Sequence, residues 1–253
     1  MSALPPPSPP PPPPPGGLTP PPGYVQYGPG GQRGFQPIGG LTRWLVIALT
    51  ATIVTQLMSL LSQALLRDDA VTFADNLDEL TGRFGFFLLT SLLAAVIGIA
   101  QLVLLIIWTF RMAKNLELLG RKLSFGAGAT IAINILGGCT LGILNFFMWK
   151  EQWQASDPEV APHDPSWKQG RVAPLIVANL VLGLVGTAVG LGLGLRSGLA
   201  GFADTNTDTL SENLADRFGL LLLSGLLTAA ASVVFLLLVR QLATRHMRAT
   251  GEA

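Results

Sequence analysis

Four strongly apolar stretches of this chain, poor in glycine or rich in Leu, Val and Ala, run for more than twenty residues without a single Asp, Glu, Lys or Arg. They lie between Arg43 and Arg67, Arg83 and Arg111, Arg171 and Arg196, and Arg217 and Arg240. Each exceeds the roughly 20 residues that an α-helix needs to cross about 30 Å of hydrocarbon. The whole chain is 49% hydrophobic and 12% charged, whereas soluble proteins are about 25% charged. The pattern predicts an all-α, polytopic integral membrane protein with four transmembrane helices.

The second and fourth runs resemble each other. Both begin with Arg-Phe-Gly, at Arg83 and at Arg217, and both follow a loop that opens with Phe-Ala-Asp, at Phe73 and at Phe202. Internal repeats of this kind occur in many membrane proteins. We therefore expect two similar hairpins, over residues 44–110 and 172–239.

A fifth uncharged segment, residues 124–149, is less easily assigned. It is long enough to span a membrane, but it contains five glycines, including the pair Gly137-Gly138. If it dips into the membrane and returns, twelve of the sixteen Lys and Arg residues fall on one side. That bias is typical of cytoplasmic loops. If the segment crosses the membrane as a fifth span, eight Lys and Arg residues lie on each side. The charge pattern favours a Gly-broken re-entrant or surface-lying segment, and a fifth span remains the alternative.

The amino-terminal residues 1–40 hold fifteen of the nineteen prolines. Consecutive prolines favour polyproline II, and a chain of this composition has no means of burying a core. We expect a disordered Pro/Gly-rich tail, cytoplasmic under the preferred topology, ahead of a helical membrane domain over residues 41–253. The tail is either a docking strip for a protein partner or a solvated spacer.

Two motifs carry a family resemblance: "WTFRMAKNLELLG", residues 108–120, and "WQASDP", residues 153–158. With the Pro-rich tail and the glycine-rich apolar segment between them, they resemble bacterial membrane proteins grouped as domain of unknown function 4328. The resemblance implies a bacterial cytoplasmic membrane and no known activity. Its signature positions here are Arg111, Asn115, Gly120, Trp153, Ala155 and Ser156.

Glycines recur every fourth residue in the third uncharged run, at Gly186, Gly190, Gly194 and Gly198. Small residues at this spacing share one helix face and let a second helix approach closely. The ladder predicts helix packing, either within the chain or between two copies of a homo-oligomer.

Signatures of catalysis are missing from the sequence. The single Cys139 and the separated His163 and His246 form no metal-ligand or catalytic spacing, and a net charge of +1 argues against nucleic acid. We expect no enzyme activity, cofactor or metal. The leading hypothesis is a non-enzymatic scaffold or interaction component in contact with the lipid bilayer. The alternative is a small channel or transporter in which Asn134 and Asn145 of the middle segment form a polar membrane site.

Overall fold

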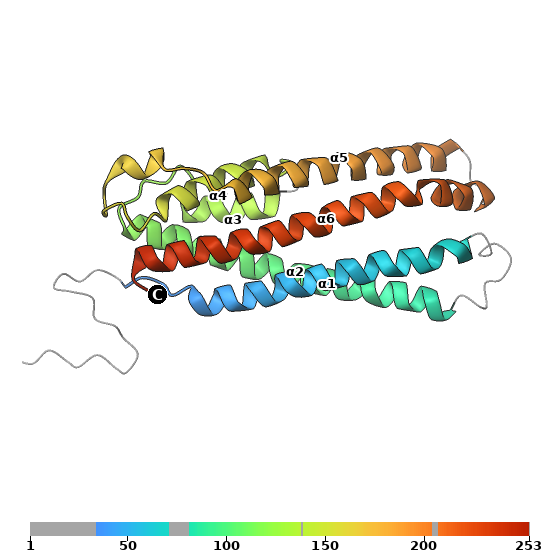
Figure 1. The fold of residues 1–253 in the computed structure, drawn as a ribbon, viewed down its shortest axis with the longest axis horizontal. Coiled ribbons are helices and arrows are strands. Elements are labelled where there is room, and N and C mark those ends of the chain that lie inside the picture. Colours follow the sequence, from blue (N-terminus) through green and yellow to red (C-terminus); the bar gives the residue numbers. More distant parts are fainter. Residues whose placement is uncertain (1–33, 71–80, 138, 204–206, 253) are drawn as a thin grey trace, which may run out of the picture. The chain divides into compact units, whose positions relative to one another are not determined.

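The computed structural model describes residues 34–70, 81–137, 139–203 and 207–252. All regular structure in these ranges is helical, and residues 35–253 form one compact unit. The tail predicted to be disordered lies outside the described residues up to residue 33. The elements, shown in Figure 1, are α1 (Gly39–Ala70), α2 (Thr81–Leu118), α3 (Ala127–Leu136), α4 (Ile143–Ala155), the short 3-10 helix η1 (Pro165–Gln169), α5 (Pro174–Ala203) and α6 (Thr207–Thr250).

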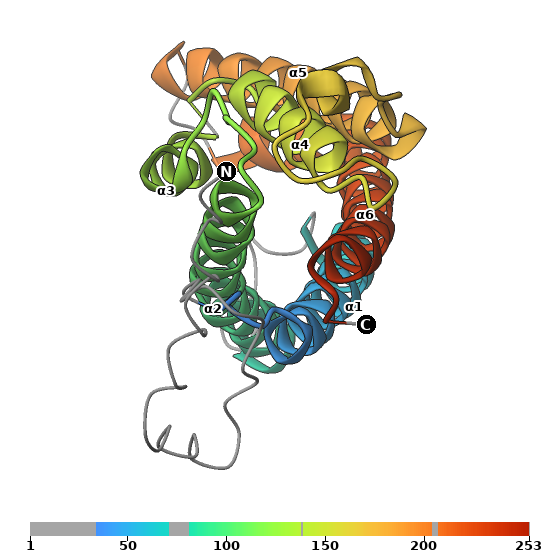
Figure 2. The same cartoon turned by 90° about the vertical axis from the view of Figure 1, so that its left-hand side faces the viewer.

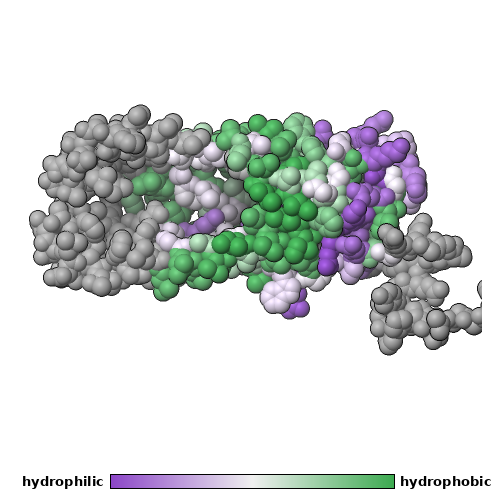
Figure 3. Space-filling view, turned by 180° about the vertical axis from the view of Figure 1, so that it is seen from behind, coloured by the Kyte–Doolittle hydropathy of each residue, from purple (hydrophilic) through white to green (hydrophobic). Residues whose placement is uncertain are grey.

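Within the described residues, three helices are long and apolar enough to cross a membrane: Gly39–Ser62 of α1, Leu89–Leu118 of α2 and Phe218–Thr250 of α6. Their large apolar side chains are exposed; Leu92 and Ile99 of α2, for example, are 65% and 66% exposed. Figure 3 shows these side chains as a hydrophobic band beside a hydrophilic end. So much exposed apolar surface is stable only in lipid, and the chain is therefore a multi-pass membrane protein.

The predicted fourth span falls on α5. The part of α5 whose surroundings are described, Pro174–Gly190, is apolar but shorter than the three candidate spans. The four-span arrangement consequently stays a prediction.

Each helix packs against one or more neighbouring helices. α1 packs on α2 and on α6, α5 packs on α6, α3 lies against α2, and α4 contacts α5. Viewed along the bundle, the helices follow one another around a ring in the order α3, α2, α1, α6, α5, α4 (Figure 2). α4 therefore lies between α3 and α5 in this ring, and α5 packs on α6.

Burial on α2 and α6 follows the register of the sequence repeat. Aligning Arg83 with Arg217 pairs the buried residues Trp108, Thr109, Met112 and Leu116 of α2 with Leu242, Ala243, His246 and Thr250 of α6, all of which are also buried. Both helices thus turn the same face inward near their carboxyl ends.

One apolar core lies where these ends meet α1, α4 and α5. Its largest members are Trp108 and Trp149, whose ring centroids are 6.1 Å apart, and Phe235 packs against Trp149 at 5.6 Å. The indole Nε1 of Trp108 donates a hydrogen bond to Thr42 Oγ1 of α1 at 2.9 Å. This core holds α3 and α4 against the long helices.

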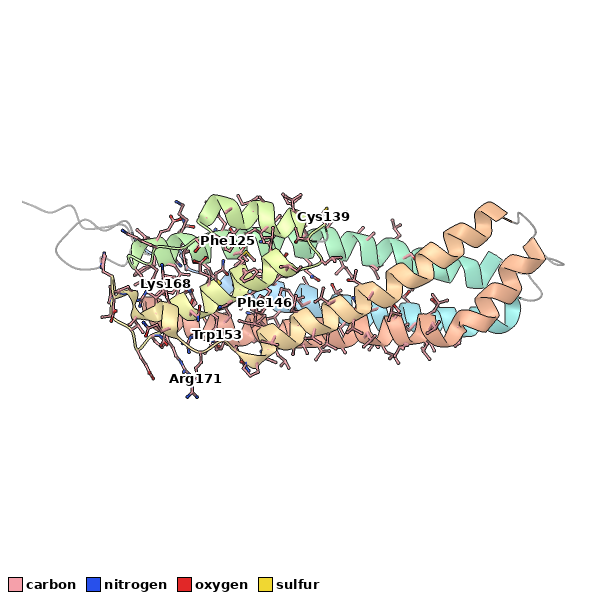
Figure 4. All side chains as sticks on the ribbon, turned by 90° about the horizontal axis from the view of Figure 1, so that it is seen from above. Phe125, Cys139, Phe146, Trp153, Lys168 and Arg171 are labelled. Carbon is pink, nitrogen blue, oxygen red and sulfur yellow. The ribbon has the colours of Figure 1, made fainter. Side chains whose placement is uncertain are left out.

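The middle segment is two short helices rather than one long one. Glu151 of α4 accepts hydrogen bonds from the backbone N–H groups of Ser124 and Phe125, just before α3. The start of α3 and the end of α4 therefore meet. Figure 4 shows Cys139 at the turn between them, about halfway along the bundle, and Phe125 and Trp153 near its hydrophilic end. The segment enters the bundle and returns to the same end.

The structure describes only the first residue of the Gly137-Gly138 pair. Gly137 is right-handed, and Gly138 lies outside the described residues. The left-handed residues are Leu141, with φ of 51°, and Gly142, with φ of 77°. A Cβ atom at Gly137 would lie 2.5 Å from Asn145 Oδ1, so a larger residue there would require the Asn145 side chain to move.

Candidate functional site

A buried polar cluster joins three helical segments at the hydrophilic end. This end, called the polar end below, comprises residues 35–43, 111–126, 150–173 and 240–252. Asn115 of α2, His246 of α6 and Ser156 just after α4 are all fully buried. Asn115 Nδ2 lies 3.2 Å from His246 Nε2, and Ser156 Oγ lies 3.1 Å from His246 Nδ1. The imidazole therefore bridges residues 131 and 90 positions away in the sequence.

Hydrogen bonds between Gln36 and Asn115 determine which ring nitrogen of His246 carries the proton. Gln36 N–H donates to Asn115 Oδ1 at 2.8 Å, and Asn115 Nδ2 donates to Gln36 C=O at 2.9 Å. The amide orientation is thereby set, and the second Nδ2 proton points to His246 Nε2. That nitrogen accepts, so the proton of the neutral ring is on Nδ1, which donates to Ser156 Oγ. The neutral His246 side chain therefore links Asn115 of α2 to Ser156 after α4.

The segment that precedes α1 is fastened to the polar end. The Glu252 carboxylate accepts hydrogen bonds from Ile38 N–H at 3.0 Å and Gly39 N–H at 2.7 Å, where the positive end of the α1 dipole favours an anion. Arg111 donates to Pro37 C=O at 3.1 Å, and Phe35 packs against the buried Leu116. Residues 35–39 are therefore held in an ordered position at this end.

A second set of contacts orders the loop after α4. α2 ends in a Schellman motif: Gly120 has φ of 73°, Gly120 N–H bonds to Glu117 C=O and Arg121 N–H bonds to Leu116 C=O. The buried Arg121 side chain then donates to Asp164 C=O at 2.9 Å and Val160 C=O at 2.6 Å.

Two acidic residues complete the loop. The Asp164 carboxylate accepts from Ser166 N–H at 2.8 Å, and this hydrogen bond lowers the pKa of the Asp164 carboxyl below its ordinary value. Asp157 forms an ion pair with Arg245 of α6 at 2.7 Å, and the Arg245 guanidinium lies 4.9 Å from the Trp153 ring centroid. Charge and aromatic contacts thus tie the loop to both α2 and α6.

The six signature positions of the family resemblance all fall at this end. Asn115 and Ser156 contact His246, Gly120 ends α2, Arg111 holds Pro37, Trp153 stacks with Arg245, and Ala155 is fully buried. Sequence reasoning treated His246 as an isolated basic-tail residue and missed its role. The available signal was the repeat, which places His246 at the position of the buried Met112.

The predicted polar membrane site is only partly assembled. Asn134 Nδ2 donates to Thr109 Oγ1 of α2 and to Thr130 C=O of its own helix, both at 2.8 Å. Its Oδ1 and the Oδ1 of Asn145 are buried without a hydrogen-bond partner. Nothing in the described residues joins the two asparagines to each other. Gln152 of α4 adds two further buried and unpartnered amide atoms, and no sequence motif singles this residue out.

Two members of the glycine ladder face α6. A Cβ atom on Gly186 would lie 3.9 Å from Leu227, and one on Gly190 would lie 4.0 Å from Ser224 Oγ. The surroundings of Gly194 and Gly198 are outside the described part of α5. Among the described glycines, the tightest contact is elsewhere: a Cβ atom on Gly225 of α6 would lie 2.1 Å from Leu60 Cδ2 of α1.

Within the described ranges, no three His, Cys, Asp or Glu side chains form a cluster that could hold a metal ion. Comparison with protein-family models, curated proteins and solved structures finds no match to this chain. The candidate functional site is therefore defined by its geometry alone: the polar end, whose segments are joined by a buried polar cluster.

Proposed function

We propose that the protein is a non-enzymatic scaffold of a bacterial cytoplasmic membrane, with four spans in two hairpins, a re-entrant α3–α4 segment and a cytoplasmic polar end. Positive charge supports this orientation. Eleven Lys and Arg residues lie in the polar end, and such residues are concentrated on the cytoplasmic side of membrane proteins. The resemblance to domain of unknown function 4328 agrees with this assignment.

The observation that carries the proposal is the fastening of residues 35–39 to the polar end. Asn115, Arg111 and Glu252 hold this short segment by six hydrogen bonds to its backbone: its N–H groups donate four, and Gln36 C=O and Pro37 C=O accept one each. A tail that only spaced the membrane from solvent would need no fixed attachment. Here the Pro-rich tail starts from an ordered surface, so both can contact one partner.

The tail is tested with the full-length protein in native membranes. We expect proteins that crosslink to the intact chain to be lost when residues 1–33 are deleted, and also when the prolines of residues 9–15 are replaced by alanine, because alanines do not hold the polyproline II conformation. A chain with the same tail residues in scrambled order is the control. Identical crosslinked proteins from all four chains would contradict the scaffold.

A channel is the second candidate, and one observation favours it. The buried, unpartnered oxygens of Asn134 and Asn145 and the unpartnered amide of Gln152 all lie in the re-entrant segment. Buried polar atoms without protein partners commonly bind water. If they line a conduction path, ion flux into liposomes falls when Asn145 is replaced by leucine; flux equal to that of empty liposomes excludes the channel.

A further inference from the structure

We propose that a groove at the polar end binds the phosphate group of an anionic phospholipid. This proposal rests on the membrane location in the proposed function and names a ligand for the same polar end. The groove encloses about 470 Å³ between the end of α4 and the last turns of α6. It is lined by Trp153, Asp157, Pro158, Glu159, Arg240, Gln241, Thr244, Arg245 and Arg248. The volume is within the range of small-ligand sites.

Arg245, one of the lining residues, is held in place by three contacts. Its guanidinium pairs with Asp157 at 2.7 Å, donates to Trp153 C=O at 3.2 Å and lies over the Trp153 ring. These contacts occupy its charge and hold α4 and α6 together. Arg245 therefore shapes the groove, and its charge is already balanced by Asp157.

The two other arginines supply the free positive charge. Arg240 and Arg248 are exposed, stand two turns apart on the same face of α6, and make no ion pair or side-chain hydrogen bond in the described structure. Apart from the Arg245–Asp157 pair, their only charged counterpart in the lining is Glu159. The two guanidiniums and the Gln241 amide offer the hydrogen-bond donors that a phosphate accepts.

The groove lies next to the apolar part of α6, which favours a lipid as the molecule that carries the phosphate. The uncharged run of α6 ends at Val239, and Arg240 is the next residue. Val233 and Leu237 are exposed, and they precede Arg240, Gln241 and Thr244 on the same helix face. Acyl chains lying along Val233 and Leu237 would therefore place their phosphate directly at Arg240.

The test uses the purified full-length protein in a mild non-ionic detergent. Isothermal titration calorimetry compares short-chain phosphatidylglycerol, short-chain phosphatidylcholine and inorganic phosphate. We expect phosphatidylglycerol to bind more tightly than the other two. The double variant R240Q/R248Q should bind it about 30-fold more weakly, since each basic residue near an anionic lipid contributes about fivefold.

The matched control is K122Q/R171Q, which removes two exposed charges from the same end but outside the groove. Its affinity should stay within about twofold of the wild type. Equal loss in both double variants would overturn the site in favour of general attraction, and inorganic phosphate binding as tightly as phosphatidylglycerol would overturn the lipid as its ligand. Because calorimetry in detergent does not depend on topology or on the tail, these results are distinguishable from failure of the proposed function.

Discussion

Replacing Asn115 with leucine is expected to lower the free energy of unfolding by about 3 kcal/mol, because a buried polar group that loses its partner costs about 1–3 kcal/mol. Leucine has a similar volume but can neither accept from Gln36 N–H nor donate to Gln36 C=O and His246 Nε2. His246 is fully buried, so water cannot replace the lost donor there. Chemical unfolding in detergent micelles, followed by tryptophan fluorescence, measures the change.

A control for this substitution is Gln169→Leu, which changes an exposed amide at the same end of the protein. We expect it to alter the free energy of unfolding by less than about 0.5 kcal/mol. A second readout is proteolysis near residue 36, which should accelerate in Asn115→Leu alone because the segment before α1 is released. If both variants unfold like the wild type, the buried cluster does not hold the polar end together.

Gly225→Ala is expected to lower the free energy of unfolding by about 2 kcal/mol, within the range found for overpacked cores. The new methyl group would lie 2.1 Å from Leu60 Cδ2 and 3.0 Å from Leu60 Cγ. Leu60 is itself buried, so it has little room to rotate away. The helices α1 and α6 must then separate, and the dispersion contacts that hold helices together in lipid are lost.

Gly219→Ala is the matched control in the same helix. No atom lies within 4 Å of a Cβ atom at Gly219, and alanine is the better helix former by about 1 kcal/mol. Thermal unfolding in micelles should therefore show a lower midpoint for Gly225→Ala and an equal or higher midpoint for Gly219→Ala. The same decrease in both would mean that the close contact at Leu60 does not limit packing.

The helical fold was accessible from sequence because hydropathy and charge act locally. The uncharged runs after Arg43, Arg83 and Arg217 each overlap most of one of the three candidate spans. The glycine content of the middle segment likewise indicated a break, and a helix does end at Leu136. The exact turn was not predictable, because Leu141, with φ of 51°, belongs to a residue type that rarely adopts the left-handed conformation.

The polar cluster was not accessible in the same way. Gln36, Asn115, Ser156 and His246 come from four segments, and no periodicity links them. Only the approach of α2, α4 and α6 in the folded chain brings them together. Similarly, the sequence pattern predicted close packing at the glycine ladder of α5, whereas the tightest contact of a described glycine occurs at Gly225, which has no glycine at the ladder spacing before or after it.

The central claim is that α3 and α4 enter the membrane and return, so that both ends of this segment lie on the same side. The direct test is cysteine labelling in intact cells with a membrane-impermeant maleimide, after Cys139→Ser removes the native thiol. Single cysteines are placed at Lys122 and Ser166, which are exposed at the polar end, and at Thr72 between the first two helices. The buried Ser156 is avoided because it bonds to His246.

We expect label at position 72 alone in intact cells, and at all three positions once the membrane is permeabilised. Equal protection of positions 122 and 166 would establish that the chain returns to the cytoplasmic side after α4. Label at position 166 but not at position 122 would contradict the account, because the segment between them would then cross the membrane.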